Sequence, residues 1–124
     1  MNTGSELLKT LCRHSVLKAK DFNSQSIANV LNTLSMIRYR DDVLIATLSK
    51  ETLYKAGDFN SQELANTLNA MAKFDHYDDA VIVKLLKEAL SKAGDFNSQE
   101  LANTLNAMAK FDHYYEAVIV KLLK

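Results

Sequence analysis

DFNSQELANTLNAMAK, the stretch formed by residues 58–73, recurs without a change at residues 95–110. A looser copy, DFNSQSIANVLNTLSM, occupies residues 21–36, so each copy begins 37 residues after the previous one. A fixed period of this length is typical of a solenoid, in which stacked copies bury a core that a single copy cannot build. The repeat therefore predicts a chain of stacked units.

The first letters of the repeat are typical of the start of a helix. Asn60 is a good N-cap residue, and Glu63 follows three positions later, where its carboxylate can accept a hydrogen bond from the N-cap amide. Phe59 and Leu64 flank the cap at the spacing of a hydrophobic staple. The other copies repeat the cap at Asn23 and Asn97 and the staple at Phe22/Ile27 and Phe96/Leu101. Ser26 replaces the glutamate in the first copy.

Each unit is expected to contain two helices joined by a short polar turn. In the central unit, apolar residues recur at helical spacing from about Ser61 to Phe74, and the polar letters DHYD then interrupt them. Asp78 opens a second apolar helix, where a negative charge suits the N-terminal end of the helix dipole. Every unit is therefore predicted to be a helix-turn-helix.

The second helix carries its own end signals. Gly94, like Gly57 one repeat earlier, is predicted to end the helix in the left-handed conformation. Glu88 and Lys92 stand four residues apart on one face, a spacing that predicts an ion pair worth a few tenths of a kcal/mol. Both signals place the end of the helix just before the next copy begins.

We expect residues 1–124 to form one domain, an all-α α-solenoid of about seven helices in stacked helix-turn-helix repeats. It is expected to divide into a half repeat, two repeats and a truncated repeat, at residues 1–20, 21–57, 58–94 and 95–124. Neither end carries a polar capping repeat, so apolar residues such as Val118, Ile119 and Leu122 are expected to stay accessible. The sequence therefore predicts self-association.

The composition is that of an ordinary folded protein. Of 124 residues, 48% are hydrophobic and 24% are charged, no run of 18 apolar residues indicates a membrane span, and the start MNTGSELLKTLCRH lacks the apolar core of a secretory signal. We expect a cytoplasmic protein without membrane contact, with secretion as a bacterial effector as the alternative. The single cysteine, Cys12, lies in a helical pattern and is expected to be a buried apolar residue.

The formal net charge of zero hides a gradient along the chain. Residues 1–20 carry four basic side chains and one acidic side chain, whereas residues 58–94 carry four lysines and six acids. A nucleic-acid-binding module usually presents a basic stripe, and by sequence only the N-terminal end is basic. Any binding of RNA is therefore expected to be weak and sensitive to salt.

The repeat core FNSQELANTLNAMAKF resembles the 37-residue heptatricopeptide repeats and the related octotricopeptide repeats, and it is also similar to bacterial repeats of unknown function. The resemblance covers nearly the whole chain. It implies an α-solenoid of helical hairpins and, for the organellar members, RNA binding by a surface of stacked first helices. Asn32, Asn69 and Asn106 stand where many members carry tryptophan. The similarity to bacterial repeats implies instead a protein-binding or host-interaction role.

Polar residues form a stripe on the first helix of each unit. At 100° per residue, Gln62, Asn66, Asn69 and Lys73 lie within about 60° of one another, away from the apolar face. Stacking would align them with the equivalent residues of the other copies, which are Gln25, Asn29, Asn32, Gln99, Asn103, Asn106 and Lys110. Asparagine inside a helix costs roughly half a kcal/mol relative to alanine, so we call these residues the amide stripe and look for what retains them.

Two explanations of the amide stripe are open. Amides can bond the edges of unstacked bases and lysines can meet phosphates, which would make the stripe an RNA-binding surface. Asparagines can instead bond the neighbouring repeat and fix the register of the stack. The first explanation requires the side chains to be open on the concave face, and the second requires them to be enclosed between first helices. A module that binds single-stranded RNA and a protein-interaction scaffold without a nucleic-acid role are the corresponding functions.

The sequence patterns favour neither an enzyme nor a site for a cofactor or a metal. The chain has no glycine-rich phosphate loop and no nucleophile beside a base, and its acids lie at helix starts, where capping explains them. His76 and His113 stand one repeat apart in the turns, so they are expected to be about 10 Å from each other, too far to share a metal ion. We expect turn residues here, with Tyr77 packing toward Ile82.

Overall fold

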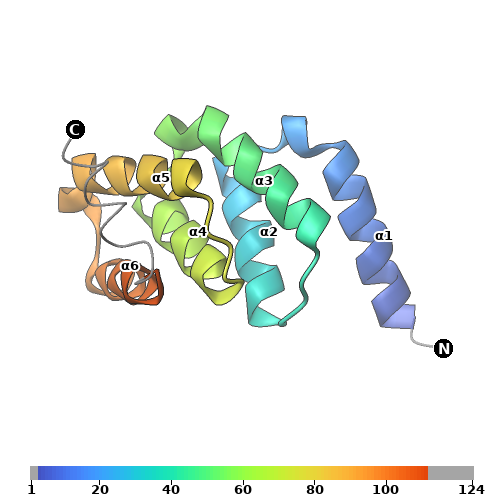
Figure 1. The fold of residues 1–124 in the computed structure, drawn as a ribbon. Helices are drawn as coiled ribbons and strands as arrows, with labels where there is room; N and C mark the ends of the chain where they lie inside the picture. The colour runs from blue at the N-terminus through green and yellow to red at the C-terminus, as the bar shows by residue number, and fades with distance from the viewer. Residues whose placement is uncertain (1–2, 112–124) are drawn as a thin grey trace.

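The computed structural model describes residues 3–111, and the helices of this part follow the repeat (Figure 1). They are α1 (Thr3–Leu17), α2 (Ser24–Met36), α3 (Asp42–Lys55), α4 (Ser61–Lys73), α5 (Asp79–Ser91) and α6 (Ser98–Lys110), with the short 3₁₀ helices η1 (Ala19–Asp21), η2 (Ala56–Asp58) and η3 (Ala93–Asp95). The described residues contain no strand, which confirms the all-α solenoid of helical hairpins. The predicted seventh helix, with Val118, Ile119 and Leu122, falls outside the described residues, and the division into units stays a prediction.

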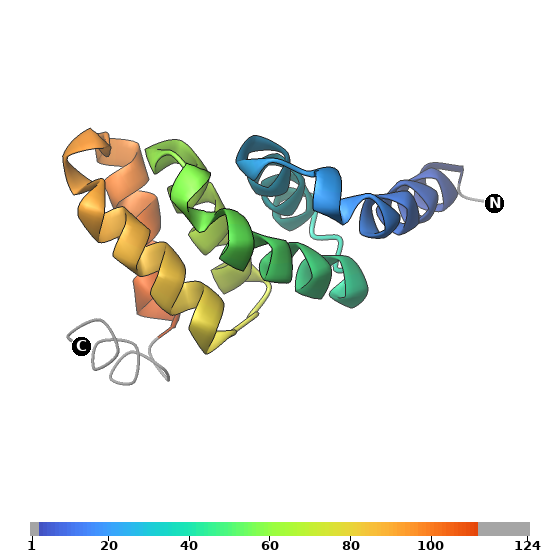
Figure 2. The same ribbon diagram turned by 90° about the horizontal axis from the view of Figure 1, so that it is seen from above.

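The helices form two rows. The first helices of the units, α2, α4 and α6, pack against one another in one row, while α1, α3 and α5 form the other. α1 and α6 lie at opposite ends of the stack in both views (Figures 1 and 2). Contact is extensive between the first helices and sparser between the second helices. The row of first helices is therefore the tighter side of the stack, and all three units contribute to its surface.

The core lies between the two rows and between successive units. In the central unit, Leu64, Leu68 and Met71 of α4 and Val81 and Leu85 of α5 are fully buried. These residues are the ones that helical spacing assigns to the apolar faces, and burying each of them contributes about 1.5–3 kcal/mol. Burial of apolar side chains between the helices is thus the main stabilising contribution.

The equivalent leucines of α6 are exposed. Leu101 is 45% exposed and Leu105 is 64% exposed, whereas Leu64 and Leu68, which stand 37 residues earlier, are 0% exposed. The cause is the position in the stack, because α4 has a first helix on both sides and α6 packs against α4 on one side. A leucine of this repeat is therefore buried by the next unit as much as by its own.

The residues predicted to start the first helices do so. Asn60 Oδ1 accepts a hydrogen bond from the amide of Glu63 at 2.8 Å, and Glu63 Oε1 accepts one from the amide of Asn60 at 3.0 Å. Caps of this kind contribute about 1 kcal/mol each. The predicted caps are confirmed also at Asn97 with Glu100 and at Asn23 without a glutamate. Asp78, which was predicted to open the second helix, caps α5.

The prediction that Gly57 and Gly94 end the second helices in the left-handed conformation is wrong. Neither glycine has a positive φ, because both lie inside the 3₁₀ helices η2 and η3, which tighten the chain into the next unit with right-handed backbone. A Cβ at Gly94 would meet nothing within 4 Å. The glycines are therefore not required by backbone conformation.

The left-handed residues follow the first helices instead. Arg38 has a φ of 59° after α2, and Asp75 has a φ of 53° after α4. The amide of the next residue then donates back into the helix, at 3.0 Å from Tyr39 to Leu34 and at 2.9 Å from His76 to Met71. This pattern is the Schellman motif at the end of a helix. A residue other than glycine is destabilised in its left-handed position, because its Cβ is too close to the backbone.

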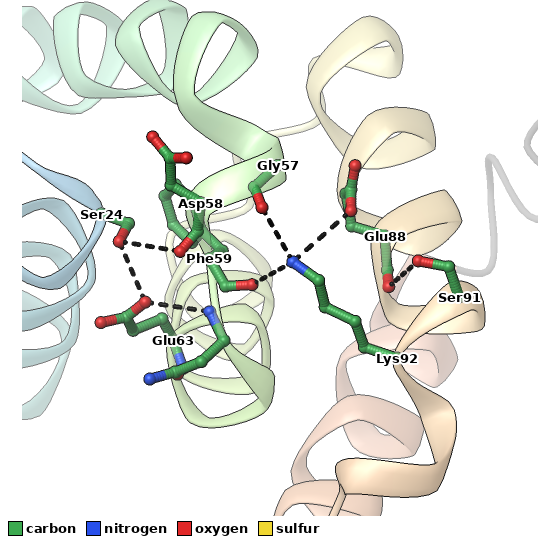
Figure 3. A network of polar contacts seen from close by, with 9 residues as sticks. Ser24, Gly57, Asp58, Phe59, Glu63, Glu88, Ser91 and Lys92 are labelled. Carbon is green, nitrogen blue, oxygen red and sulfur yellow. Dashed lines mark hydrogen bonds and ion pairs between the residues drawn. The ribbon is translucent and has the colours of Figure 1, made fainter.

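Lysine side chains join successive turns, as Figure 3 shows for Lys92. Lys92 Nζ donates to the carbonyl oxygens of Gly57 and Phe59 at 3.0 and 2.6 Å and lies 3.6 Å from a carboxylate oxygen of Glu88. One repeat earlier, the same arrangement joins Lys55 to the carbonyls of Lys20 and Phe22 and to Glu51. The spacing of Glu88 and Lys92 predicts the pair inside the helix, but not the carbonyls of the preceding turn.

A second polar contact joins neighbouring first helices. The hydroxyl of Ser24, at the start of α2, lies 3.0 Å from Glu63 Oε1 and 3.3 Å from the carbonyl oxygen of Asp58 (Figure 3). The glutamate that completes the cap of α4 therefore also holds the start of α2. Helix initiation and stacking share this carboxylate.

Candidate nucleic-acid interface

The amide stripe lies on α2, α4 and α6, one row of the stack. Its glutamines and its two lysines are exposed, and its asparagines are exposed or half-buried. The stripe residues are Gln25, Asn29, Asn32, Gln62, Asn66, Asn69, Lys73, Gln99, Asn103, Asn106 and Lys110. Because the three helices pack side by side and the residues repeat with the period of the stack, their side chains form one strip across the units.

The amides of the stripe do not bond one another in the described part of the chain. The hydrogen bond that a stripe side chain makes there is a long one, from Asn32 Nδ2 to the sulfur of Met36 at 3.6 Å within α2. No stripe asparagine of residues 3–111 bonds the neighbouring helix, and none of their polar atoms is buried without a partner. Four of the six stripe asparagines are half-buried and two are exposed, and none of their amides is bonded to a neighbouring unit within residues 3–111. Both explanations of the stripe therefore stay predictions.

A cationic hollow lies where the C-terminal ends of the first helices meet. It has a volume of about 650 Å³ and is lined by Ser35, Met36, Arg38, Arg40, Lys73, Phe74 and Lys110. Lys73 and Lys110 are the lysines of the amide stripe, and Met36 holds the same position on α2. The stripe thus runs from glutamines near the helix N-termini into the cationic hollow.

Arg40 secures one wall of the cationic hollow. Its guanidinium donates to the carbonyl oxygen of Phe74, at the end of α4, and lies 2.6 Å from Asp42 Oδ1. The last carbonyls of a helix have no partner inside the helix, so this contact satisfies one of them from the neighbouring unit. The charge of Arg40 is therefore already engaged.

Tyr77 stands 37 residues after Arg40 and contacts the end of α6 as Arg40 contacts the end of α4. Its hydroxyl lies 3.1 Å from the carbonyl oxygen of Lys110 and 2.9 Å from Asp75 Oδ1. Its ring packs edge-on against Phe111, with the ring centroids 5.3 Å apart. These contacts join two units, whereas packing toward Ile82 inside one unit stays a prediction.

Arg38, Lys73 and Lys110 have no acidic partner among residues 3–111. The ion pairs in that part of the chain join Arg40 to Asp42, Lys55 to Glu51 and Lys92 to Glu88. Lysine in the last helical turn gains a few tenths of a kcal/mol from the helix dipole, which explains each lysine singly. It does not explain three gathered cations, because like charges in a hollow repel one another and focus a positive potential there.

Within the described residues, His76 belongs to no group of side chains that could hold a metal ion. His76 is half-buried, and its Nε2 is enclosed without a hydrogen-bond partner. Burial lowers the pKa of His76, the carboxylate of Asp78 opposes the shift, and the charge of Arg40 adds to it. The fold therefore favours the neutral imidazole. No group of three His, Cys, Asp or Glu side chains in the described ranges could hold a metal ion, and His113 lies beyond them.

Cys12 is buried, as predicted. Burial raises the pKa of its thiol, and the nearby Asp41 carboxylate raises it further. A protonated, enclosed thiol is a poor nucleophile.

In the part of the chain that the structure describes, no helix has the length and hydropathy needed to cross a membrane.

Sequence reasoning missed Arg38 and Arg40 as members of the site. The signal was present, because Arg38 and Arg40 replace Asp75 and Tyr77 at the equivalent positions of the next unit. Two arginines in one turn departed from the repeat, and the left-handed backbone at Arg38 then places that turn at the cationic hollow.

Two protein-family models match the chain. Residues 2–80 match the family described as RNA-editing substrate-binding complex 6 protein, and residues 92–105 match a family described as protein of unknown function (DUF1601). No curated protein and no solved structure matches. The first match spans α1 to α4, which carry most of the amide stripe. The resemblance to heptatricopeptide and octotricopeptide repeats stays a prediction.

Proposed function

We propose that the chain, which belongs to the RNA-editing substrate-binding complex 6 protein family, is a non-catalytic helical-repeat module that binds single-stranded RNA along α2, α4 and α6. The observation that carries the proposal is the amide stripe, whose side chains are exposed or half-buried and make no hydrogen bond to a neighbouring unit within residues 3–111. The family description supports it by naming a complex that binds RNA-editing substrates.

The chemistry of the stripe suits unstacked bases. An amide offers two donors and an acceptor, so it can bond the Watson–Crick edge of a base that is not paired. A paired base hides that edge, and the major groove of an RNA duplex is too narrow for side chains to read. The three first helices present such amides in register, so a strand crossing them meets one set per unit.

Fluorescence anisotropy with a labelled pool of single-stranded RNA at low salt tests the proposal. We expect binding at tens of micromolar protein or tighter, because few charges assist it. The same RNA annealed to complementary strands should bind more weakly. Absence of any RNA binding at that concentration would refute the proposed function.

The pair of changes Asn66→Ala and Asn103→Ala separates an RNA contact from a structural role. Alanine is the better helix former by roughly half a kcal/mol at each position, and no hydrogen bond between units is lost. We therefore expect weaker RNA binding at an unchanged or higher melting temperature. A clear fall in melting temperature would show that the asparagines hold the stack together.

A protein-interaction scaffold is the second candidate, and one observation favours it. An apolar hollow of about 380 Å³ opens between α5 and α6, lined by Leu86, Ala89, Leu90, Ala93, Phe96, Leu101, Thr104, Leu105 and Met108. Exposed apolar area of this kind is typical of a surface that another protein covers.

A host-interaction role, self-association through the ends and a cytoplasmic location stay predictions. Light scattering that gives a 13.9 kDa particle at high concentration would refute self-association.

A further inference from the structure

We propose that the cationic hollow binds the phosphate backbone of the RNA strand whose bases lie on the amide stripe; this inference rests on the proposed function and adds the part of the RNA that the hollow takes. The hollow collects Arg38, Lys73 and Lys110 from the ends of three successive first helices. One cation therefore belongs to each unit, as one set of amides does.

The cations of the hollow differ in what they are free to do. Arg40 already donates to the carbonyl of Phe74 and pairs with Asp42, so it is part of the wall. Arg38 and the two lysines are exposed and lack an acidic partner within residues 3–111. Three cations thus remain for an anion, and an anion would relieve their mutual repulsion.

The ends of the helices would repel a phosphate if their carbonyls were bare. The C-terminal end of a helix carries about half a negative charge on its unpaired carbonyls. Here Arg40 covers the carbonyl of Phe74 at α4, and the Tyr77 hydroxyl lies against the carbonyl of Lys110 at α6. One carbonyl at each of these two ends is therefore already satisfied, which lowers the repulsion that an anion in the hollow would meet.

The cations of the hollow and the amides of the stripe would contact different parts of the RNA. Neighbouring helices of such a stack lie about 8–10 Å apart, so Lys73 and Lys110 follow a strand that runs across the helices. Phosphate contacts hold a strand without reading its sequence, whereas contacts to base edges read it. The hollow should therefore supply salt-dependent affinity, and the amides beside it should supply base preference.

The test compares two labelled ligands of about 15 nucleotides, a single-stranded RNA and an abasic strand of equal charge. The variant combines Arg38→Gln, Lys73→Gln and Lys110→Gln, and its matched control combines Lys50→Gln, Lys84→Gln and Lys87→Gln, three exposed lysines of α3 and α5. Anisotropy titrations over a salt series give the slope of log affinity against log salt. Each phosphate contact on a single strand contributes about 0.7 to that slope.

We expect the hollow variant to lose about 2 from the slope with both ligands, and the control variant to keep the wild-type slope. If the wild type binds RNA and the hollow variant keeps its slope, the hollow inference is overturned and the proposed function stands. If RNA does not bind better than the abasic strand, but the hollow variant still loses the slope, the hollow inference stands and reading by the amides fails. If neither ligand binds the wild type, both are overturned.

Discussion

Replacing Lys92 by methionine tests whether the lysine clamp between turns holds the stack. Methionine keeps most of the apolar stem and removes the ammonium. The ammonium makes two hydrogen bonds, to the carbonyl oxygens of Gly57 at 3.0 Å and Phe59 at 2.6 Å, and its contact with Glu88 is longer at 3.6 Å. The change therefore removes contacts between two turns rather than an isolated surface charge.

The expected cost follows from these contacts. A hydrogen bond to a charged group contributes about 1.5–3 kcal/mol when water is excluded. The Lys92 side chain is 28% exposed, so water restores part of the loss at the freed carbonyls. We expect about 1 kcal/mol for each bond and a few tenths for the ion pair with Glu88, which gives about 2 kcal/mol in all.

Urea unfolding followed by circular dichroism measures the loss. With a slope of about 2 kcal/mol per molar urea, the midpoint should fall by about 1 M. Lys87→Met is the matched control, since Lys87 is exposed on the same helix and should change little. Lys55→Met, one repeat earlier, should repeat the loss. A Lys92→Met variant within 0.5 kcal/mol of the wild type would refute the clamp.

Three further changes test the backbone, the core and the turn. Arg38→Gly should be about 1 kcal/mol more stable than Arg38→Ala in thermal unfolding, because φ is 59° there; equal stability would contradict the strain. Thr67→Val should raise the melting temperature, because the Thr67 hydroxyl is buried without a hydrogen-bond partner and the first unit has Val30 at the equivalent position. Thr104→Val should not raise it, because the Thr104 hydroxyl donates to the carbonyl oxygen of Glu100 at 2.8 Å. The fold lowers the pKa of His76, so on acidification the histidine is protonated in the unfolded chain before it is protonated in the folded chain. The free energy of unfolding should therefore fall as the pH drops below about 6.5. His76→Gln should reduce that fall, and an unchanged pH profile would contradict the role of His76.

Local rules predicted the starts of the helices and the faces they bury. Asn60 and Glu63 lie three residues apart, so one turn of helix brings them together whatever surrounds them. Leu64 and Leu68 follow the helical period, and the stack buries them. A repeat places the same local signals in every unit, which is why the solenoid could be predicted from the sequence.

The features that sequence reasoning missed are contacts between units or departures from the commonest backbone. Lys92 lies four residues after Glu88, but its carbonyl partners stand 33 and 35 residues away. The left-handed backbone falls on Arg38 rather than on Gly57, because the first helix has a Schellman end and the second runs into a 3₁₀ helix. Spacing along one helix carries neither fact.

The candidate site divided in the same way. The amide stripe follows from helical spacing within one unit and lies on a shared row of helices. The cationic hollow requires the ends of three helices to meet, so Lys73 and Lys110 were found as stripe residues and Arg38 was not found at all. Its binding role remains a proposal that a direct measurement can decide.

That measurement is a titration of the ¹⁵N-labelled chain with single-stranded RNA, followed by NMR. The side-chain NH₂ groups of glutamine and asparagine give their own signals, so the stripe can be observed directly. We predict that the signals of Gln62, Asn66 and Asn69 shift on adding RNA, while backbone signals of α3 and α5 stay in place. Shifts confined to α3 and α5, or none at all, would contradict RNA binding along the first helices.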